Sequence, residues 1–209
     1  MPALSESEIA AELAAFEVTL PPPALSQLSC YLELLLRWNQ RINLTGLRDP
    51  ETIVRRLFGE SLCIARAVEL RGRLVDIGSG AGFPGLALKL AAPDLRVTLV
   101  EARQKKCAFL KEVARQCGFS HVEVVAERFE EWARREEETA DLVTTRAVAM
   151  DTKLWQAAKT LLAPAGKAVL LTTPELARAI QTENSGWLWV AIPPAHPVSA
   201  SVVLIGTIR

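Results

Sequence analysis

The run V-D-I-G-S-G-A-G-F-P-G, residues Val75 to Gly85, shows what kind of sheet this chain can build. A short apolar segment, 74–77, is followed by alternating glycines and then by an apolar segment with helical character that ends near Leu90. Strand, glycine loop and helix in this order are typical of the first βαβ unit of a nucleotide-binding sheet. Glycines without a Cβ permit positive φ angles and let a flat ligand approach the main chain. We therefore expect a cofactor at this loop; the alternative is a turn whose glycines serve only tight packing.

The residues around the loop distinguish between two kinds of cofactor. A dinucleotide fingerprint needs glycine where Phe83 stands and free N–H groups where Pro84 removes one, so a dehydrogenase is the least favoured reading. A carboxylate at Asp76 suits a sulfonium or ammonium cation. Glu101, at the end of the next strand, can accept hydrogen bonds from ribose hydroxyls. S-adenosylmethionine carries both a sulfonium cation and a ribose with free hydroxyls. The cofactor residues predicted from this region are Asp76, Gly78, Gly80, Gly82, Phe83 and Glu101.

Strand and helix patterns alternate along the rest of the chain. We expect strands at 74–77, 96–100, 121–125, 141–145, 167–172, 187–192 and 201–208, and helices at 84–91, 103–117, 128–137, 151–162 and 174–182. This alternation predicts an α/β fold with a mostly parallel seven-stranded sheet. Together with the S-adenosylmethionine site expected at the glycine loop and Glu101, it indicates the Rossmann-like class I methyltransferase sheet. The loop 193–197 is too short for a parallel crossover, so the last two strands should form an antiparallel hairpin at the sheet edge.

Three helices are predicted before the first strand. Ser5 and Glu8 form a capping box for the first, the second spans about 24–39, and Asp49 and Pro50 begin a third that continues to about Leu70. We expect residues 1–72 to form an N-terminal helical extension and residues 73–209 to form the cofactor-binding domain.

Composition limits the remaining possibilities. The chain has 209 residues, half of them hydrophobic, and no net charge. It has no apolar run long enough to span a membrane and no basic leader, so we expect a cytoplasmic protein without membrane contact. Its four cysteines and two histidines are scattered, which indicates neither a disulfide framework nor a metal site. We also expect a monomer.

Basic residues are distributed unevenly. Residues 1–30 contain four acids and no base, whereas residues 31–73 contain eight arginines and five acids. A second basic segment follows Glu101. Such segments can bind a nucleic-acid backbone, but solvated helix faces look similar, and both readings stay open. The basic residues concerned are Arg37, Arg41, Arg48, Arg55, Arg56, Arg103, Lys105, Lys106, Lys111 and Arg115.

Two further segments follow the ends of predicted strands, where ligands bind in such sheets. After the third strand, Phe129 can lie against an adenine while the region of Glu130 reads the base edge; equally, Phe129 can anchor the next helix together with Trp132. After the fourth strand, Arg146 can position a phosphate, a base or the cofactor carboxylate, and it is the candidate positioning residue. The alternative is a plain surface arginine. No catalytic residue is assigned.

The absence of certain motifs indicates which kind of substrate atom accepts the methyl group. Methylation of cytosine C5 needs a cysteine nucleophile, and methylation of an exocyclic amine usually accompanies an N-P-P-Y-like turn. The turn after the fourth strand reads T-T-R-A, residues 144–147, and neither device is visible. A ring nitrogen such as guanine N7 carries a free lone pair and no proton, so proximity and orientation can supply most of the acceleration.

Several motifs together resemble the RsmG (GidB) family, bacterial methyltransferases that act on guanine N7 in small-subunit ribosomal RNA. The resemblance covers most of the chain, and its most specific part is the glycine run with its proline and final glycine. The segments that carry it are Trp38–Asn39, Arg41, Asn43–Thr45, Arg48–Pro50, Asp76–Gly85, Glu101, Lys105–Lys106, Phe109–Leu110, Arg128–Glu130 and Thr145–Ala147. It implies cofactor contacts at Gly78, Phe83, Glu101, Phe129, Glu130 and Arg146, and small-subunit ribosomal RNA or a ribosomal particle as the partner.

The chain departs from the family pattern at three places. Leu57 replaces a histidine, the region of Thr172 and Thr173 lacks a lysine, and Ala200 and Ser201 stand where the final strand usually begins with arginine. These departures affect the substrate side more than the cofactor loop. Two alternatives to RNA methylation therefore stay open: the same fold with a small-molecule or other RNA acceptor, and a cofactor- or RNA-binding module without turnover.

Overall fold

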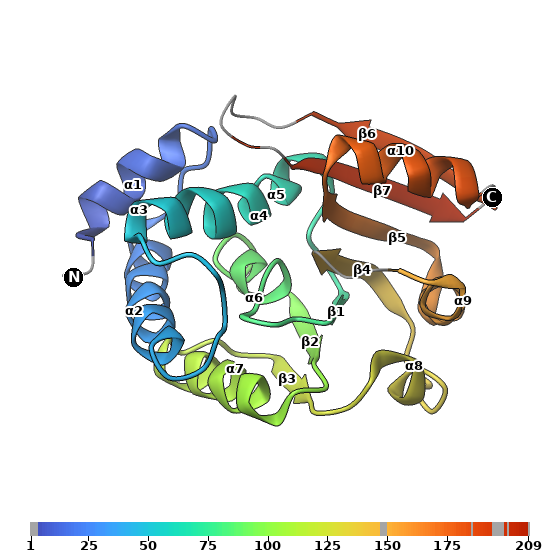
Figure 1. Ribbon diagram of the computed structural model, residues 1–209, viewed down its shortest axis with the longest axis horizontal. Helices are drawn as coiled ribbons and strands as arrows, with labels where there is room; N and C mark the ends of the chain where they lie inside the picture. The colour runs from blue at the N-terminus through green and yellow to red at the C-terminus, as the bar shows by residue number, and fades with distance from the viewer. Residues whose placement is uncertain (1–3, 147–149, 185, 194–198, 200, 209) are drawn as a thin grey trace.

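A computed structural model describes residues 4–146, 150–184, 186–193, 199 and 201–208. One seven-stranded sheet has the order β3-β2-β1-β4-β5-β7-β6 (Figure 1). The first five strands pair in parallel, and β7 pairs antiparallel with both β5 and β6. The predicted fold class and the edge hairpin are confirmed. Ala147, the loop 194–197 and Ala200 lie outside the described residues. The strands are β1 (Arg73–Ile77), β2 (Arg96–Val100), β3 (Val122–Val125), β4 (Ala140–Arg146), β5 (Leu162–Thr172), β6 (Trp187–Ile192) and β7 (Val202–Ile208).

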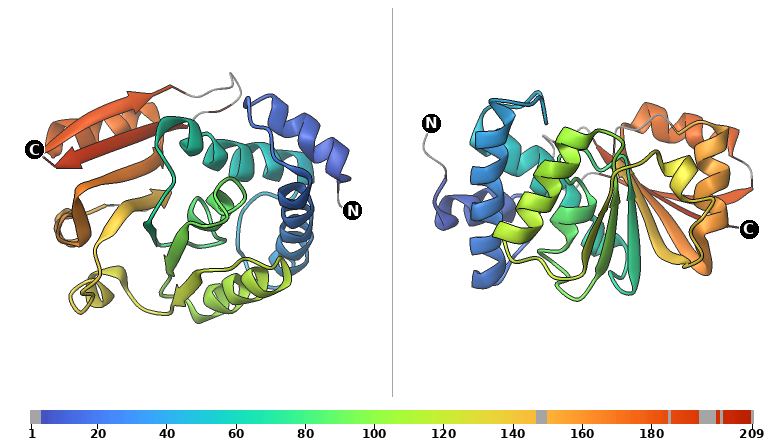
Figure 2. Two further views of the ribbon diagram at one scale, coloured as in Figure 1. Left: turned by 180° about the vertical axis from the view of Figure 1, so that it is seen from behind. Right: turned by 90° about the horizontal axis from the view of Figure 1, so that it is seen from below.

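Helices cover both faces of the sheet, as the view from below shows (Figure 2). The helices that precede β1, together with α6 and α7, share one hydrophobic cluster with one sheet face. The three later helices share a second cluster with the opposite face. Their bounds are α1 (Glu6–Ala14), α2 (Pro22–Asn39), α3 (Pro50–Ile53), η1 (Val54–Gly59), α4 (Glu60–Leu62), α5 (Ile64–Ala67), α6 (Gly85–Leu88), α7 (Gln104–Gln116), α8 (Phe129–Trp132), α9 (Thr152–Leu161) and α10 (Pro174–Glu183).

The N-terminal helices are built into the main core. The predicted capping box at Ser5 and Glu8 is present at the start of α1. On α2, Leu28, Tyr31 and Leu35 are fully buried in the cluster that also contains sheet residues. The division at residue 72 stays a prediction, because this hydrophobic cluster includes residues from both sides of it.

The predicted third helix is not continuous. It consists of α3, the π-helical segment η1, α4 and α5. At Gly59 a Cβ would lie 2.7 Å from the Phe16 ring, so the glycine lets Phe16, two residues beyond the end of α1, pack directly on this helix. Helical periodicity in sequence does not reveal such a contact, because it marks the apolar face of a helix but not which distant residue packs on that face.

One strand is longer than predicted. β5 begins at Leu162, directly after α9, and not at 167. Pro164 and Gly166 make this segment look like a loop in sequence. In the structure, β5 can approach β4 closely at Gly166 because this residue has no side chain. A Cβ there would lie 2.9 Å from the carbonyl oxygen of Ala140 on β4.

Candidate functional site

The glycine loop after β1 is attached to the end of β2. The N–H groups of Gly78 and Ser79 donate to the carbonyl of Val100 at 2.9 and 3.2 Å. Gly78, Gly80 and Gly82 have φ angles of 64°, 59° and 92°, values that only glycine adopts readily. The loop can therefore turn sharply at the carboxyl edge of the parallel strands, where ligands bind in such sheets.

A cleft of about 390 Å³ opens beside this loop. Five of the predicted cofactor residues line it, and these are Gly78, Gly80, Phe83, Glu101 and Arg146. The remaining lining residues are Leu44, Thr45, Leu57, Ser79, Ala81, Arg103 and Lys106. The cleft thus combines a glycine backbone, one carboxylate and three cations.

Glu101 is fixed in the cleft by the main chain. Its Oε2 accepts a hydrogen bond from the Gly80 N–H at 3.0 Å, and its Oε1 accepts one from the Arg103 N–H at 2.8 Å. The residue is buried. A carboxylate has about four lone-pair sites, so each oxygen keeps one for a ligand hydroxyl. This geometry suits a ribose with its two adjacent hydroxyls.

Replacing Glu101 should weaken cofactor binding. Glu101→Ala removes the acceptor of the ribose hydroxyls and frees the Gly80 N–H, so we expect S-adenosylmethionine to bind about 1–3 kcal/mol more weakly in calorimetry. Glu112→Ala is the matched control, since Glu112 pairs with Arg115 on α7 and does not line the cleft. Unchanged affinity in Glu101→Ala would remove this residue from the ribose site.

Asp76 lies beneath the loop. Its Oδ1 accepts a hydrogen bond from the Thr144 hydroxyl at 2.8 Å, while its Oδ2 is buried without a hydrogen bond of normal geometry in the described part of the chain. Burial raises the pKa of Asp76 to about 7, although the Thr144 hydroxyl and the nearby Gly85 backbone act in the opposite direction. Asp76 does not line the cleft. The Asp76 carboxylate is therefore not in direct contact with the cleft.

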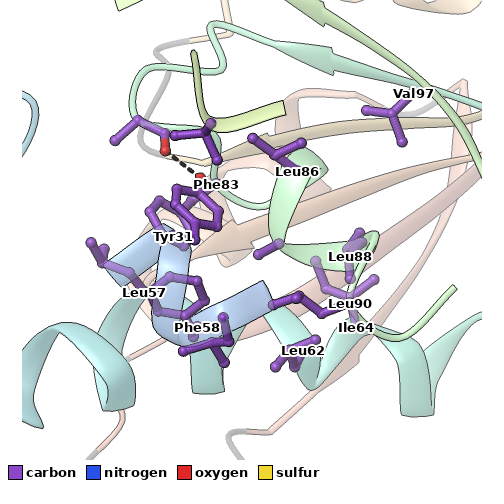
Figure 3. Packing of buried hydrophobic residues seen from close by; sticks show 14 of the residues in the cluster. Tyr31, Leu57, Phe58, Leu62, Ile64, Phe83, Leu86, Leu88, Leu90 and Val97 are labelled. Atoms are coloured by element: carbon purple, nitrogen blue, oxygen red, sulfur yellow. Dashed lines mark hydrogen bonds between the residues drawn. The ribbon is translucent and has the colours of Figure 1, made fainter. Parts of the chain in front are cut away.

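Phe83 is part of the core as well as of the cleft wall. Its ring stacks on Tyr31 with centroids 5.5 Å apart and meets Phe58 edge to face at 4.9 Å (Figure 3). The Tyr31 hydroxyl donates to the carbonyl of Ala81 at 2.5 Å, and a Cβ on Gly82 would lie 2.1 Å from that hydroxyl oxygen. Gly82 therefore makes room for Tyr31, and α2 supports the loop through this side chain.

Phe129 and Glu130 are not among the residues that line the cleft. Phe129 is buried in the second hydrophobic cluster, where its ring centroid is 6.1 Å from that of Trp132. Glu130 is half-buried, and its carboxylate lies 3.9 Å from Arg128. This placement corresponds to the anchoring alternative for Phe129. Their contact with an adenine stays a prediction.

Arg146 forms an ion pair with the buried Glu60. Its Nη2 donates to Glu60 Oε2 at 2.8 Å, whereas its Nη1 is buried without a hydrogen-bond partner among the described residues. Burial lowers the pKa of Arg146, and the charge of Glu60 opposes this shift. An arginine that lines the cleft with one unused donor can receive an acceptor group from a ligand.

Sequence reasoning missed the contribution of the turn after α2. The Asn39 side chain is buried, donates to the Leu47 carbonyl at 2.9 Å and accepts from the N–H groups of Leu44 and Thr45 at 3.0 Å each. It thereby places Leu44 and Thr45 on the cleft wall. An asparagine at a helix end before a turn was the available signal.

Three further observations on the described residues concern cysteines, metal sites and membrane-spanning helices. All four cysteines are free thiols. Within the described ranges there is no group of three or more His, Cys, Asp or Glu side chains placed to hold a metal ion. Among the described helices none has both the length and the apolar character of a membrane span.

Comparison with known proteins identifies the family. The family described as GidB, rRNA small subunit methyltransferase G, matches residues 24–193. The chain belongs to this family. It is similar to the ribosomal RNA small subunit methyltransferase G of Halorhodospira halophila, with 41% identity over 74% of this chain and 72% of that protein. The corresponding protein of Xylella fastidiosa strain M23 is 49% identical over 56% of this chain and 57% of its own length.

A solved structure of the same fold is MtNAS in complex with MTA and tNA. Its TM-score is 0.62 at 15% sequence identity, and the match covers 88% of this chain and 73% of that one. At this identity the likeness concerns the fold alone, and it agrees with the class I methyltransferase sheet predicted above.

Proposed function

We propose that this GidB family member is an S-adenosylmethionine-dependent methyltransferase that acts on guanine N7 in small-subunit ribosomal RNA. One observation carries the cofactor assignment: Glu101, held by the N–H groups of Gly80 and Arg103, lies in one cleft with the glycine loop. The buried Asp76 beneath the loop adds negative charge that favours a cationic methyl donor. The family name supports ribosomal RNA as the substrate.

The proposed chemistry needs no proton transfer. When bound, S-adenosylmethionine supplies a sulfonium methyl group: the N7 lone pair forms the new N–C bond, the S–C bond breaks, and its electron pair stays on sulfur. Glu101 and the glycine loop hold the nucleoside part, and Arg146 offers a donor to the cofactor carboxylate or to the base. Phe83, Leu57 and Leu44 contribute apolar side chains to the cleft lining. Catalysis then depends mainly on orientation.

A basic surface beside the cleft fits an RNA backbone. Arg41, Arg103, Lys105 and Lys106 surround a depression of about 390 Å³ that shares Arg103 and Lys106 with the cofactor cleft. None of the four side chains pairs with an acid in the part of the chain that the structure describes. Unpaired cations at this position can bind phosphates and release counterions.

Removing two of these cations should change the salt dependence of RNA binding. In Arg41→Ala with Lys105→Ala, the slope of log K against log salt concentration should become less steep by roughly one for each phosphate that is no longer neutralised. Arg115→Ala is the matched control, because Arg115 on α7 is paired with Glu112 at 3.0 Å. The measurement is binding of a small-subunit RNA fragment at several salt concentrations. An unchanged slope would place the RNA elsewhere.

The proposed activity is tested by methylation assays on naked small-subunit RNA and on ribosomal particles, with mapping of any modified base. We expect transfer to one guanine N7. Transfer to a small molecule without RNA would favour a different acceptor, and tight cofactor binding without any transfer would favour a binding module. We further propose that the protein acts as a monomer in the cytoplasm, where ribosomal particles are assembled.

The positions at which this chain departs from the family pattern give a structural basis for the two alternatives, a different acceptor and a binding module without turnover. Leu57 lines the cleft where the family has histidine, and the Thr172 hydroxyl is buried without a partner among the described residues. Ser201, in place of arginine, donates to Glu60 at 2.9 Å. Leu57 thus shares the cleft with Arg146, and Ser201 contacts the acid that pairs with Arg146. The substrate side of the site differs from the family pattern, while the cofactor loop keeps it.

A further inference from the structure

Two of the four free cysteines meet between α2 and α7. Cys30 is on α2, and Cys117 is the residue that follows the last turn of α7. The Cys117 sulfur lies 3.1 Å from the sulfur of Cys30, although 87 positions separate the two residues in the chain. In a disulfide the sulfurs are about 2.0 Å apart, so a bond between them needs an approach of about 1 Å.

The helices that carry the two thiols are already packed against each other (Figure 1). Trp38 on α2 meets Phe109 on α7 edge to face, with ring centroids 5.7 Å apart. The Gln27 side chain on α2 donates to the Cys117 carbonyl at 3.0 Å. A disulfide at this place would therefore join two helices that side-chain packing and a hydrogen bond already hold together.

The two thiols differ in their access to solvent. Cys30 is half-buried, whereas Cys117 is buried. Burial, together with the hydrogen bond to Cys30, raises the pKa of Cys117, so this thiol is protonated at neutral pH. The thiolate is the form that attacks an oxidant. Cys30 is therefore the sulfur that an oxidant reaches first, and Cys117 is the neighbouring thiol that can complete a disulfide.

We propose that Cys30 and Cys117 form a reversible disulfide when the protein meets a peroxide, and that this bond stabilises the folded chain. The Cys30 thiolate attacks one oxygen of hydrogen peroxide, the O–O bond breaks, and Cys30 becomes a sulfenic acid. The hydroxide that leaves takes up the proton released by the Cys30 thiol and becomes water. The Cys117 sulfur then attacks the Cys30 sulfur: the S–S bond forms, the S–O bond breaks, and the oxygen leaves as a second water with the Cys117 proton. The two sulfurs together lose two electrons, and the peroxide gains them.

The new bond would enclose most of the cofactor cleft in one covalent ring. Apart from Arg146, the described residues that line the cleft all lie between positions 30 and 117. A cross-link between positions this far apart restricts the unfolded chain more than the folded one. The oxidised protein should therefore resist unfolding better than the reduced protein. Because Cys30 is only half-buried, a thiol reductant can reach its sulfur and reverse the bond.

Thiol counting and peptide mapping test this proposal. The whole chain is reduced and treated with hydrogen peroxide, the excess is destroyed with catalase, and free thiols are counted under denaturing conditions. We expect the count to fall from four to two. Mass spectrometry of a non-reduced digest should show the Cys30 and Cys117 peptides joined, and dithiothreitol should restore all four thiols. The melting temperature of the oxidised protein should exceed that of the reduced protein by about 5–15 °C.

Cys63→Ser is the matched control, because Cys63 is half-buried, as Cys30 is, and has no sulfur partner among the described residues. This variant should keep the cross-link and the rise in melting temperature, whereas Cys30→Ser should lose both. Cys117→Ala covers the case in which Cys30→Ser does not fold. Four thiols left after oxidation, a bond between other cysteines or between two chains, a sulfinic acid at Cys30 without a cross-link, or a melting temperature unchanged by oxidation would each overturn the proposal.

Discussion

Gly80→Val is expected to weaken S-adenosylmethionine binding more than about 100-fold, which corresponds to about 2.7 kcal/mol, while the protein remains folded. Gly80 has a φ of 59°, and a Cβ there would have only the Gly78 carbonyl oxygen at 3.7 Å and Lys106 Nζ at 3.8 Å within reach. The valine side chain would therefore extend into the cleft without colliding with the core. It would occupy the space in which the nucleoside approaches the main chain.

Backbone strain has to be separated from this blocking effect. A β-branched residue in the left-handed region costs about 1–2 kcal/mol by itself. Gly118 after α7 is a matched control, because its φ is 68° and a Cβ there would have nothing within 4 Å. Gly118→Val should lower the melting temperature to a similar extent as Gly80→Val but leave cofactor affinity unchanged. Normal affinity in Gly80→Val, measured by calorimetry, would show that the cofactor binds elsewhere.

Asp76→Asn is expected to remove a large part of the pH dependence of stability. The pKa of Asp76 is raised to about 7 by burial, whereas an aspartate in the unfolded chain titrates near about pH 3.9. Between these values the folded protein retains a proton that the unfolded chain releases. The free energy of unfolding therefore falls as pH rises from about 4 to about 7 and stays low above that. The contribution of Asp76 to this fall is roughly 2–4 kcal/mol.

Urea unfolding monitored by the fluorescence of the five tryptophans checks this prediction. The difference in unfolding free energy between wild type and Asp76→Asn should change by roughly 2–3 kcal/mol between about pH 5 and pH 8. Asp94→Asn, on the exposed turn before β2, controls for the loss of one carboxylate. Parallel curves for wild type and Asp76→Asn would mean that Asp76 has an ordinary pKa.

The same titration should appear in cofactor binding. A cationic methyl donor favours the ionised form of Asp76, so its affinity for wild type should increase as pH rises through about 7 and should not do so for Asp76→Asn. This outcome would support the proposed electrostatic role of Asp76, whose carboxylate does not line the cleft.

The predicted site residues line the cleft mainly where the cleft is made of backbone. Gly78 and Gly80 line the cleft because positive φ angles and the missing Cβ are properties of single residues, and Glu101 does so because it ends the strand beside β1. Phe83 was assigned to the cofactor alone, yet it also stacks on Tyr31 of α2. Phe129 packs beside Trp132, three residues further along the chain. The sequence pattern was compatible with this position and equally with a position against the adenine.

The sequence by itself determined the parallel sheet, its antiparallel last hairpin, the glycine loop and the acid that follows the next strand. These depend on local hydrophobic periodicity, on glycine conformation and on loop length, all of which act over a few residues. Only the tertiary structure decided that Arg146 pairs with the buried Glu60, that Tyr31 supports the loop, and that Gly59 packs the third helix against Phe16. These contacts join residues more than 40 positions apart, and the packing of the whole chain sets their geometry.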